Sequence, residues 1–289
     1  MNFFRKKLLF ATDTPEGKIE ASLKSGIKYP IQQQPFVYRP SSCPFCVCDA
    51  IWSTLMGVSP VEYFNSDFYF SVGTTVHLTI QKYLSESDFL LGNWHCPHCD
   101  KTWGPALSPQ KCPSCGHRPI YEELTLYGPL GLQGHCDGLL WFPDESLILE
   151  IKTTSLANVD NIEDKPYHQK HWTQASLYVE MANIWFERTN TARRISDILF
   201  LYVPRDNPMK FRPIRKSYDK TALALNTASK ASYDFAMSTG DFSDINRICA
   251  SQEDAGDCQW KYLCFSANPR GEMLAKWQEY KNAETGERG

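Results

Sequence analysis

Residues 123–155 read ELTLYGPLGLQGHCDGLLWFPDESLILEIKTTS, and this stretch decides the fold. It contains two runs rich in strand-forming residues, separated by FPDES, where proline and aspartate are typical turn residues. Residues 147–151 are apolar enough for a buried central strand, although one acid, Glu150, lies inside it. The wider segment 119–155 is therefore predicted to be a β meander.

Helical and strand patterns surround this meander. Helices are predicted over 49–57, 72–86, 168–188 and 218–238, and a further buried strand over 196–204. In the second of these helices, Val76, Ile80 and Tyr83 fall at helical spacing on one face. Strands followed by a helix and another strand, with helices before and after, predict an α/β fold with a mixed central sheet flanked by helices.

The composition is ordinary for a soluble globular protein. The chain has 289 residues, of which 42% are hydrophobic and 22% charged. No apolar run approaches the ~18 residues of a membrane span. The N-terminus lacks the apolar region of a secretory signal, so we expect a cytoplasmic protein, in a host cytoplasm if the gene is viral. The net charge is −3, so any track for DNA must be local.

One cluster of basic residues is a possible DNA track. It contains Lys210, Arg212, Arg215 and Lys216. A solvated strand edge explains the same cluster equally well, and the sequence leaves both interpretations open.

Asp137, Glu150 and Lys152 carry the chemistry of the meander. Side chains alternate along a strand, so Glu150 and Lys152 point to the same face, and burying such a pair is costly unless it is partnered. Hairpin-like pairing brings the carboxylate of Asp137 close to that of Glu150, which makes a hard-oxygen site for Mg²⁺ or Mn²⁺. A metal there lowers the pKa of a bound water, which Lys152 can orient or help to deprotonate. The plain alternative is a surface Glu-x-Lys pair on an exposed strand.

Four short motifs occur in a characteristic order. They are GTTVH at 73–77, GHCDG at 134–138, EIKTT at 150–154 and QASLY at 174–178. In this order and spacing the chain resembles the RecB-like branch of the PD-(D/E)xK nucleases, which includes the AddB nuclease domain and the CRISPR adaptation nucleases. The resemblance covers roughly residues 36–264. It implies a restriction-endonuclease-like core in a protein of phage or bacterial origin.

The resemblance implies roles for further residues. His77 would be an additional metal ligand, and Gln174 and Tyr178, which lie at i and i+4 on one helix face, would line the active site near the DNA. An acid before the aspartate strand, Glu122 or Glu123, would assist. Without the other motifs His77 is more simply a core or capping histidine, and core packing is the alternative for Tyr178.

The chain has 11 cysteines, a high number for a cytosolic protein, and this points to metal binding. Two Cys-x-x-Cys pairs are formed by Cys96, Cys99, Cys112 and Cys115. Their spacing is typical of a zinc ribbon, with four thiolates around one tetrahedral Zn²⁺. Residues 93–118 are poor in apolar side chains, so the metal would stabilise an inserted mini-domain. Disulfide bonds are the alternative, and His98 or His117 are substitute ligands.

The other cysteines gather near the two ends of the chain, apart from Cys136, which is predicted to be a small buried residue. They are Cys43, Cys46 and Cys48 at the front and Cys249, Cys258 and Cys264 at the end. One subset of RecB-like nucleases joins a front cysteine to three C-terminal ones through a [4Fe–4S] cluster, which thiolates suit. The resemblance implies such a cluster here, with Cys48 or Cys46 favoured as the front ligand. The wide spacing of Cys249 and Cys258 departs from the family pattern, and a second zinc site is the alternative.

The resemblance implies a phosphodiester hydrolase that acts on DNA, with preference for an exonuclease on single-stranded ends in recombination, repair or phage replication. A structure-selective or flap endonuclease would share the chemistry, and a non-catalytic nucleic-acid-binding scaffold would share only the fold. A zinc-ribbon transcription factor leaves the EIKTT strand unexplained. The chain has no Walker A motif, so unwinding would come from a helicase or recombinase partner. We expect a lead-in at 1–35 and one nuclease domain at 36–289, with the ribbon inserted in it.

Overall fold

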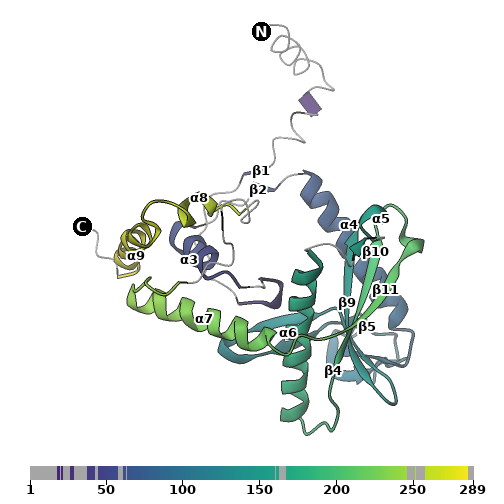
Figure 1. The fold of residues 1–289 in the computed structure, drawn as a ribbon. Helices are drawn as coiled ribbons and strands as arrows, with labels where there is room; N and C mark the ends of the chain where they lie inside the picture. The colour runs from purple at the N-terminus through teal and green to yellow at the C-terminus, as the bar shows by residue number, and fades with distance from the viewer. Residues whose placement is uncertain are drawn as a thin grey trace.

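A mixed β-sheet with helices on both faces organises the molecule (Figure 1). The computed structural model describes residues 18–19, 21, 27–28, 38–42, 45–57, 61–62, 64–159, 161–162, 167–245, 251 and 258–285. The α/β class predicted from the sequence is confirmed. Most of the predicted lead-in at 1–35 lies outside the described residues.

Seven strands form the main sheet in the described part of the chain. They are β3 (Leu90–Cys96), β4 (Lys101–Leu107), β5 (Ile120–Glu122), β8 (Gly138–Trp141), β9 (Ser146–Thr154), β10 (Asp197–Pro204) and β11 (Arg212–Ser217). Their order is β11-β10-β9-β8-β3-β4, and β5 also pairs with β3. Only the pairing of β9 with β10 is parallel among these described strands, because helix α6 (Tyr167–Arg188) connects them in a crossover.

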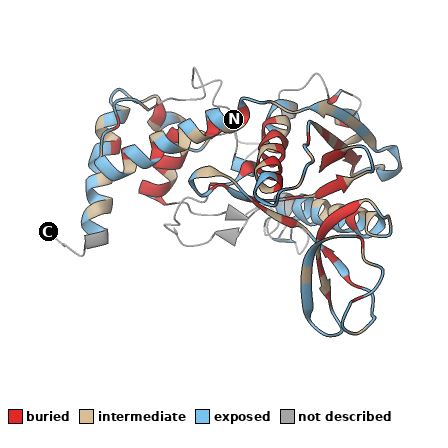
Figure 2. Cartoon of the chain, turned by 90° about the horizontal axis from the view of Figure 1, so that it is seen from below, coloured by how far each residue is buried: buried red, intermediate tan, exposed pale blue. Residues whose placement is uncertain are grey.

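Strand β9 is the centre of the sheet, as its apolar sequence predicts. Leu147, Leu149 and Ile151 face helix α4 (Phe64–Leu84), where Val76 and Ile80 pack against them. Ile148 faces the opposite core, which is built on α6. Figure 2 shows buried residues concentrated on the central strands and on the helix packed against them. Two buried faces explain why this strand is almost continuously apolar.

A group of helices lies beside the sheet (Figure 1). It contains α3 (Val47–Met56), α7 (Ala222–Thr239), α8 (Lys261–Cys264) and α9 (Pro269–Thr285). Trp260 donates a hydrogen bond to Ser53 on α3 at 2.9 Å, and Trp277 on α9 donates one to the carbonyl of Met237 on α7 at 2.8 Å. These bonds and a shared core join the C-terminal segment to α3 and α7.

The remaining described elements are short. They are β1 (Ile27–Lys28), which pairs with β2 (Val61–Glu62), β6 (Leu124–Tyr127), which pairs with β7 (Gln133–Cys136), helix α5 (Leu156–Val159), and the 3-10 turns η1 (Pro40–Ser42), η2 (Pro129–Gly131) and η4 (Pro208–Lys210). None of the described helices combines the length and the apolar composition that a membrane crossing requires.

The predicted ribbon insertion is continuous with the main sheet. Its first strand, β3, begins at Leu90 and pairs there with β8, so this hairpin is an extension of the core. Val76, Ile80 and Tyr83 lie on one face of α4, as their spacing predicts, and line one cavity there, although Tyr83 itself is 73% exposed.

Gly134→Ala is expected to destabilise the fold by about 1–3 kcal/mol. A Cβ at this position would lie 2.8 Å from Cδ of Pro40 and 3.0 Å from Cε1 of Tyr178, and both are ring atoms with little freedom to move. Urea unfolding measures the loss. The double variant Pro40→Ala/Gly134→Ala should lose less than the sum of the two single changes, and a Gly134→Ala protein as stable as the wild type would contradict the packing argument.

Candidate functional site

The site forms where the chain leaves one sheet and enters another. Strand β7 pairs with β6 in a separate two-stranded sheet, whereas β8 pairs with β9, and Asp137 is the single residue between β7 and β8. The pairing of β8 with β9 ends at Gly138 and Leu149. Beyond that point β9 has an open edge, and the carboxylate of Asp137 accepts a hydrogen bond from the Ile151 amide at 2.6 Å. The Asp137 carboxylate thus accepts a backbone hydrogen bond from β9 that a neighbouring strand would otherwise accept.

Glu150 and Lys152 form a buried ion pair beside this edge. Glu150 is 1% exposed, and the Lys152 Nζ lies 2.6 Å from its Oε1. Lys152 also donates a hydrogen bond to Oε1 of Gln174 on α6 at 3.1 Å. The other carboxylate oxygen of Glu150, Oε2, is buried and has no hydrogen-bond partner in the described structure. Such an orphaned carboxylate oxygen is costly unless a ligand completes the site.

Burial and the neighbouring charges set the protonation of this pair. Burial raises the pKa of Glu150 to about 7 although the Lys152 ammonium opposes the shift, and the charge of Asp137 adds to it. Burial acts to lower the pKa of Lys152, but the charge and hydrogen bond of Glu150 outweigh it and leave the pKa above its ordinary value. Lys152 is therefore a positive charge at neutral pH, which favours a role in orienting water or offsetting negative charge over a role as base.

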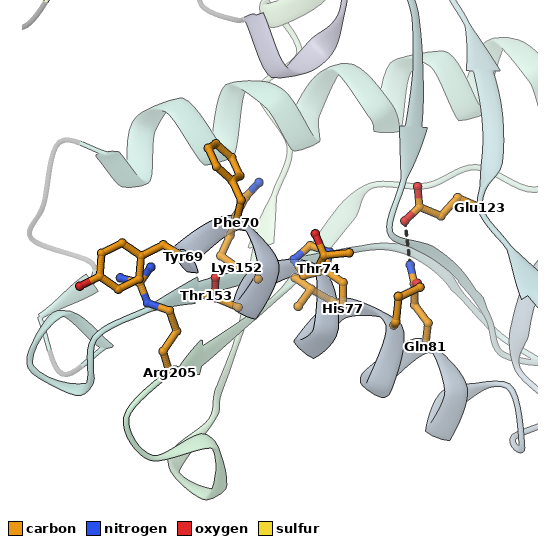
Figure 3. Close-up of a pocket in the computed structure, with 12 residues that line it drawn as sticks. Tyr69, Phe70, Thr74, His77, Gln81, Glu123, Lys152, Thr153 and Arg205 are labelled. Atoms are coloured by element: carbon orange, nitrogen blue, oxygen red, sulfur yellow. Dashed lines mark hydrogen bonds between the residues drawn. The ribbon is translucent and has the colours of Figure 1, made fainter. Parts of the chain in front are cut away.

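His77 and Gln81 hold the site from the side of α4. His77 Nδ1 lies 3.2 Å from Oδ1 of Asp137. Burial acts to lower the pKa of His77, but the hydrogen bond and charge of Asp137 raise it above the ordinary value. Gln81 donates a hydrogen bond to the Asp137 carbonyl at 2.8 Å. It donates another to Oε1 of Glu123 at 2.9 Å (Figure 3).

The structure decides between Glu122 and Glu123 and adds Gln81, which the sequence did not predict. Of these two acids, the structure brings Glu123 to the site, where burial raises its pKa, and leaves Glu122 exposed on β5. Gln81 was not predicted at all. The sequence does contain a sign of it: Gln81 follows His77 by four residues, so the two side chains lie on the same side of the helix.

Gln174 and Tyr178 lie one turn apart on α6, and Gln174 accepts a hydrogen bond from Lys152. Tyr178 is 5% exposed, and burial together with the charge of Glu150 raises its pKa above the ordinary value. It also lines a second cavity, of about 330 Å³, with Arg39 and His135. The Tyr178 side chain therefore lies close enough to Glu150 to feel its charge and also borders this second cavity.

A cavity of about 650 Å³ lies beside these groups and is lined by Lys152, His77, Gln81 and Glu123 among others. Figure 3 shows Lys152, Thr74 and His77 in the middle of its lining, with Gln81 and Glu123 at one end and Tyr69 and Arg205 at the other. Gly73 lets α4 approach β9 closely, since a Cβ there would lie 3.3 Å from Oγ1 of Thr153. The volume is within the usual range for small-molecule sites.

The donor groups of Asp137, Glu150 and His77, beside this cavity, match a hard divalent cation in their chemistry. They are two carboxylates and an imidazole, and one carboxylate oxygen of Glu150 lacks a partner. The remaining contacts of Asp137 and Glu150 are to protein donors, His77, Ile151 and Lys152. The ligand atoms of His77, Asp137 and Glu150 do not all lie within 4.8 Å of one another, a spacing that only one group of four cysteines reaches among the described residues.

Four cysteines gather at the tip of the β3–β4 hairpin. Cys96, Cys99, Cys112 and Cys115 bring their sulfur atoms within 4.8 Å of one another, which is the only such group of three or more metal-binding side chains among the described residues. The Sγ atoms of Cys96 and Cys115 are 3.4 Å apart and those of Cys99 and Cys112 are 3.7 Å apart. This group can hold a metal ion.

The two Cys-x-x-Cys segments have the same backbone geometry. Each is followed by a residue with a left-handed backbone, Asp100 at φ 56° and Gly116 at φ 75°. The amide of Asp100 donates to the Cys96 carbonyl at 2.8 Å, and that of Gly116 to the Cys112 carbonyl at 3.0 Å. Glycine adopts this conformation freely and aspartate tolerates it. The rings of His98 and His117 stack with centroids 3.6 Å apart, outside the sulfur group.

The other cysteines are described only in part. Cys48 and Cys264 line one small cavity between α3 and the C-terminal helices. Cys46 comes directly before α3 and Cys258 shortly before α8, whereas Cys43 and Cys249 lie outside the described residues. Cys136 is fully buried in the core, as predicted.

The basic cluster is largely engaged within the protein. Arg215 pairs with Glu145 at 2.6 Å and with Asp197 at 2.7 Å. Lys216 lies 4.5 Å above the ring of Trp172. These residues belong to the edge strand β11, so the interpretation as a solvated strand edge accounts for them.

Neither known protein families nor curated proteins offer a match to this chain.

Proposed function

We propose that this protein is a metal-dependent nuclease that hydrolyses DNA phosphodiester bonds. The observation that carries the proposal is that four motifs far apart in the sequence contact one another beside one cavity. His77, Asp137, the Glu150–Lys152 pair and Gln174 come from α4, the β7–β8 junction, β9 and α6, and they are the residues that the resemblance to RecB-like PD-(D/E)xK nucleases singles out. The mixed central sheet flanked by helices, which was expected from the sequence, supports the same proposal.

Asp137, Glu150 and His77 would hold Mg²⁺ or Mn²⁺. When bound, the metal lowers the pKa of a water molecule and stabilises the charge that develops on the phosphate. Lys152, which is positively charged, would orient that water and offset negative charge, and Gln174 keeps its ammonium group in place. Gln81 holds the backbone of Asp137 and is itself held by Glu123, and the Tyr178 side chain on α6 lies near Glu150.

The four-cysteine group is proposed to bind Zn²⁺. A tetrahedral ion with Zn–S bonds of ~2.3 Å places its sulfur atoms ~3.8 Å apart, and two sulfur–sulfur separations in the structure are 3.4 and 3.7 Å. An iron–sulfur cluster would hold its thiolates farther apart, because several iron atoms lie between them. No ligand position is left open, so the role is structural.

A [4Fe–4S] cluster is proposed to join α3 to the C-terminal segment. The shared cavity of Cys48 and Cys264 supports this and favours Cys48 as the front ligand. Cys249 and Cys258 would complete the set, and a second zinc site is the rival. Anaerobic purification followed by an iron count and a visible spectrum separates the two.

The direct test is digestion of end-labelled single- and double-stranded DNA by anaerobically purified protein with Mn²⁺ or Mg²⁺. We expect metal-dependent degradation, and a ladder of short products from one end identifies an exonuclease that acts on single-stranded ends. Internal fragments at junctions identify the flap-endonuclease alternative. If the fully metallated protein binds DNA but leaves every substrate intact, the nuclease proposal falls and the non-catalytic scaffold takes its place.

Binding of Mn²⁺ is expected to weaken as the pH falls below about 7. The pKa of Glu150 is raised to about 7, so protons compete with the metal for its carboxylate below that pH. The raised pKa of His77 acts in the same direction. The apparent affinity should drop by about tenfold or more between pH 7 and pH 6, and the Mn²⁺-induced rise in melting temperature reports it.

Asp137→Ala serves as the control for this measurement, since it should remove the Mn²⁺ effect at every pH. An equal rise in melting temperature at pH 6 and pH 8 for the wild type would contradict the assignment of Glu150 as a ligand.

A further inference from the structure

The first turns of α4 present aromatic side chains to solvent beside the cavity. Phe68, Tyr69 and Phe70 are 54%, 51% and 76% exposed, although large aromatic rings are normally buried. Tyr69 and Phe70 line the same cavity as Lys152 and His77. Two consecutive exposed aromatic rings, Tyr69 and Phe70, at the edge of a proposed active site indicate a surface that binds a flat apolar group.

Arg205 adds a positive charge to this surface. Its guanidinium carbon lies 4.2 Å from the centre of the Tyr69 ring, and Figure 3 shows the two side chains together at one end of the cavity. The Arg205 amide donates to the carbonyl of Thr154 at 2.8 Å, which ties this position to the end of β9. In the described parts of the chain no carboxylate forms an ion pair with Arg205, in contrast to Arg215. Its charge is available to an anionic ligand.

Stacking rings next to an available guanidinium match the chemistry of an unpaired nucleotide. A base has two flat faces that stack on aromatic rings, and its phosphate pairs with arginine. In a duplex both faces of an internal base are covered by neighbouring bases, so only an unpaired or frayed base can reach Phe70.

We infer that Tyr69, Phe70 and Arg205 form a platform that selects single-stranded nucleic acid at the mouth of the site. This inference rests on the proposed nuclease function, because it assumes that the cleaved phosphate lies near Lys152. Phe70 stacks a base, and Arg205, positioned by Tyr69, binds a neighbouring phosphate. The platform lies at the Tyr69 end of the cavity (Figure 3), so the unpaired strand enters from that end.

Binding of a labelled 20-nucleotide single strand and of the matching blunt duplex tests the platform. The variants are made in full-length Glu150→Gln protein, so that cleavage does not disturb the titration, and fluorescence anisotropy measures Kd. Phe70→Ala should weaken single-strand binding about tenfold and duplex binding less than twofold. Phe70→Trp should retain single-strand affinity and Phe70→Leu should not, which separates stacking from apolar bulk. The RNA strand of the same sequence is a second arm, and the loss is expected on whichever strand the parent protein binds more tightly.

Two further variants complete the design. Arg205→Met should weaken binding and reduce the salt dependence by about one phosphate contact. Phe235→Ala removes a similarly exposed ring, 57% exposed on α7, and should change nothing.

The outcomes separate this inference from the nuclease proposal. If the wild-type protein cleaves DNA but Phe70→Ala binds both substrates as well as its parent does, the platform is wrong and the function stands. Equal losses on single strand and duplex also overturn the platform. Single-strand binding that depends on Phe70 in a protein without cleavage supports the platform and rejects the nuclease. A protein that binds no nucleic acid rejects both.

Discussion

Glu150→Gln is expected to lower the rate of DNA cleavage by at least about 100-fold. Loss of a residue that merely supports a metal ligand typically costs 10–100-fold in affinity or activity, and Glu150 is proposed to be a ligand itself. Glutamine keeps the shape of the side chain but removes the negative charge that binds the metal and pairs with Lys152 at 2.6 Å. Initial rates on end-labelled DNA at saturating Mn²⁺ measure the effect.

Matched variants make this result specific. Glu122→Gln removes an acid that is near in sequence but exposed on β5, and its rate should equal that of the wild type. Gln174→Leu should cost about 10–100-fold, because it releases the Lys152 ammonium without removing a ligand. Circular dichroism and melting temperature establish that each variant folds. A folded Glu150→Gln protein with wild-type activity would remove this carboxylate from the mechanism.

Cys112→Ser is expected to release one equivalent of zinc and to unfold the tip of the β3–β4 hairpin. Structural zinc sites bind with apparent free energies of ~10–16 kcal/mol, and the small segments they hold seldom fold without them. The backbone amides of Ser114 and Cys115 lower the pKa of the Cys112 thiol to about 6 although desolvation opposes this, so this cysteine is disposed to bind as a thiolate. Metal analysis and hydrogen exchange over residues 97–118 measure the two effects.

The unfolding caused by Cys112→Ser should stay confined to the tip of the β3–β4 hairpin. The inner end of β3 pairs with β8, and Leu90 and Trp94 are buried in the core, so protection of β9 should persist. Cys136→Ala is the matched control, since Cys136 is buried away from the sulfur group and its loss should leave the zinc content unchanged. Full zinc content and unchanged exchange in Cys112→Ser would show that the four thiols do not share an ion.

Local patterns in the sequence predicted much of the architecture. The apolar run around Glu150 and the turn after Trp141 correctly located β8 and β9, and helices were expected close to where α3, α6 and α7 lie. The helix expected over 72–86 covers only the later part of α4, which begins at Phe64. The periods of helices and strands are short-range properties, which is why they are readable from neighbouring residues. Tyr83 shows the limit of such patterns: it shares a face of α4 with Val76 and Ile80, but it is 73% exposed.

The cysteine spacing was equally informative at the hairpin. A Cys-x-x-Cys turn places two thiols on one ion by its own geometry, so only the meeting of the two turns depended on tertiary structure. The basic cluster was undecided for the opposite reason. Its charges look free in the sequence, and only the pairing of β10 with β11 brings Asp197 next to Arg215.

The sequence by itself determined the α/β class, the central strand, the two cysteine turns and the residue types of the candidate site, because each of these is encoded within a few neighbouring residues. Only the tertiary structure decided how those residues meet. The change of sheet at Asp137 aims its carboxylate at the open edge of β9, Gln81 joins Glu123 to the backbone of Asp137, and Arg205 comes to lie on Tyr69. Strand register and helix packing are set by contacts between distant segments, and no local pattern contains that information.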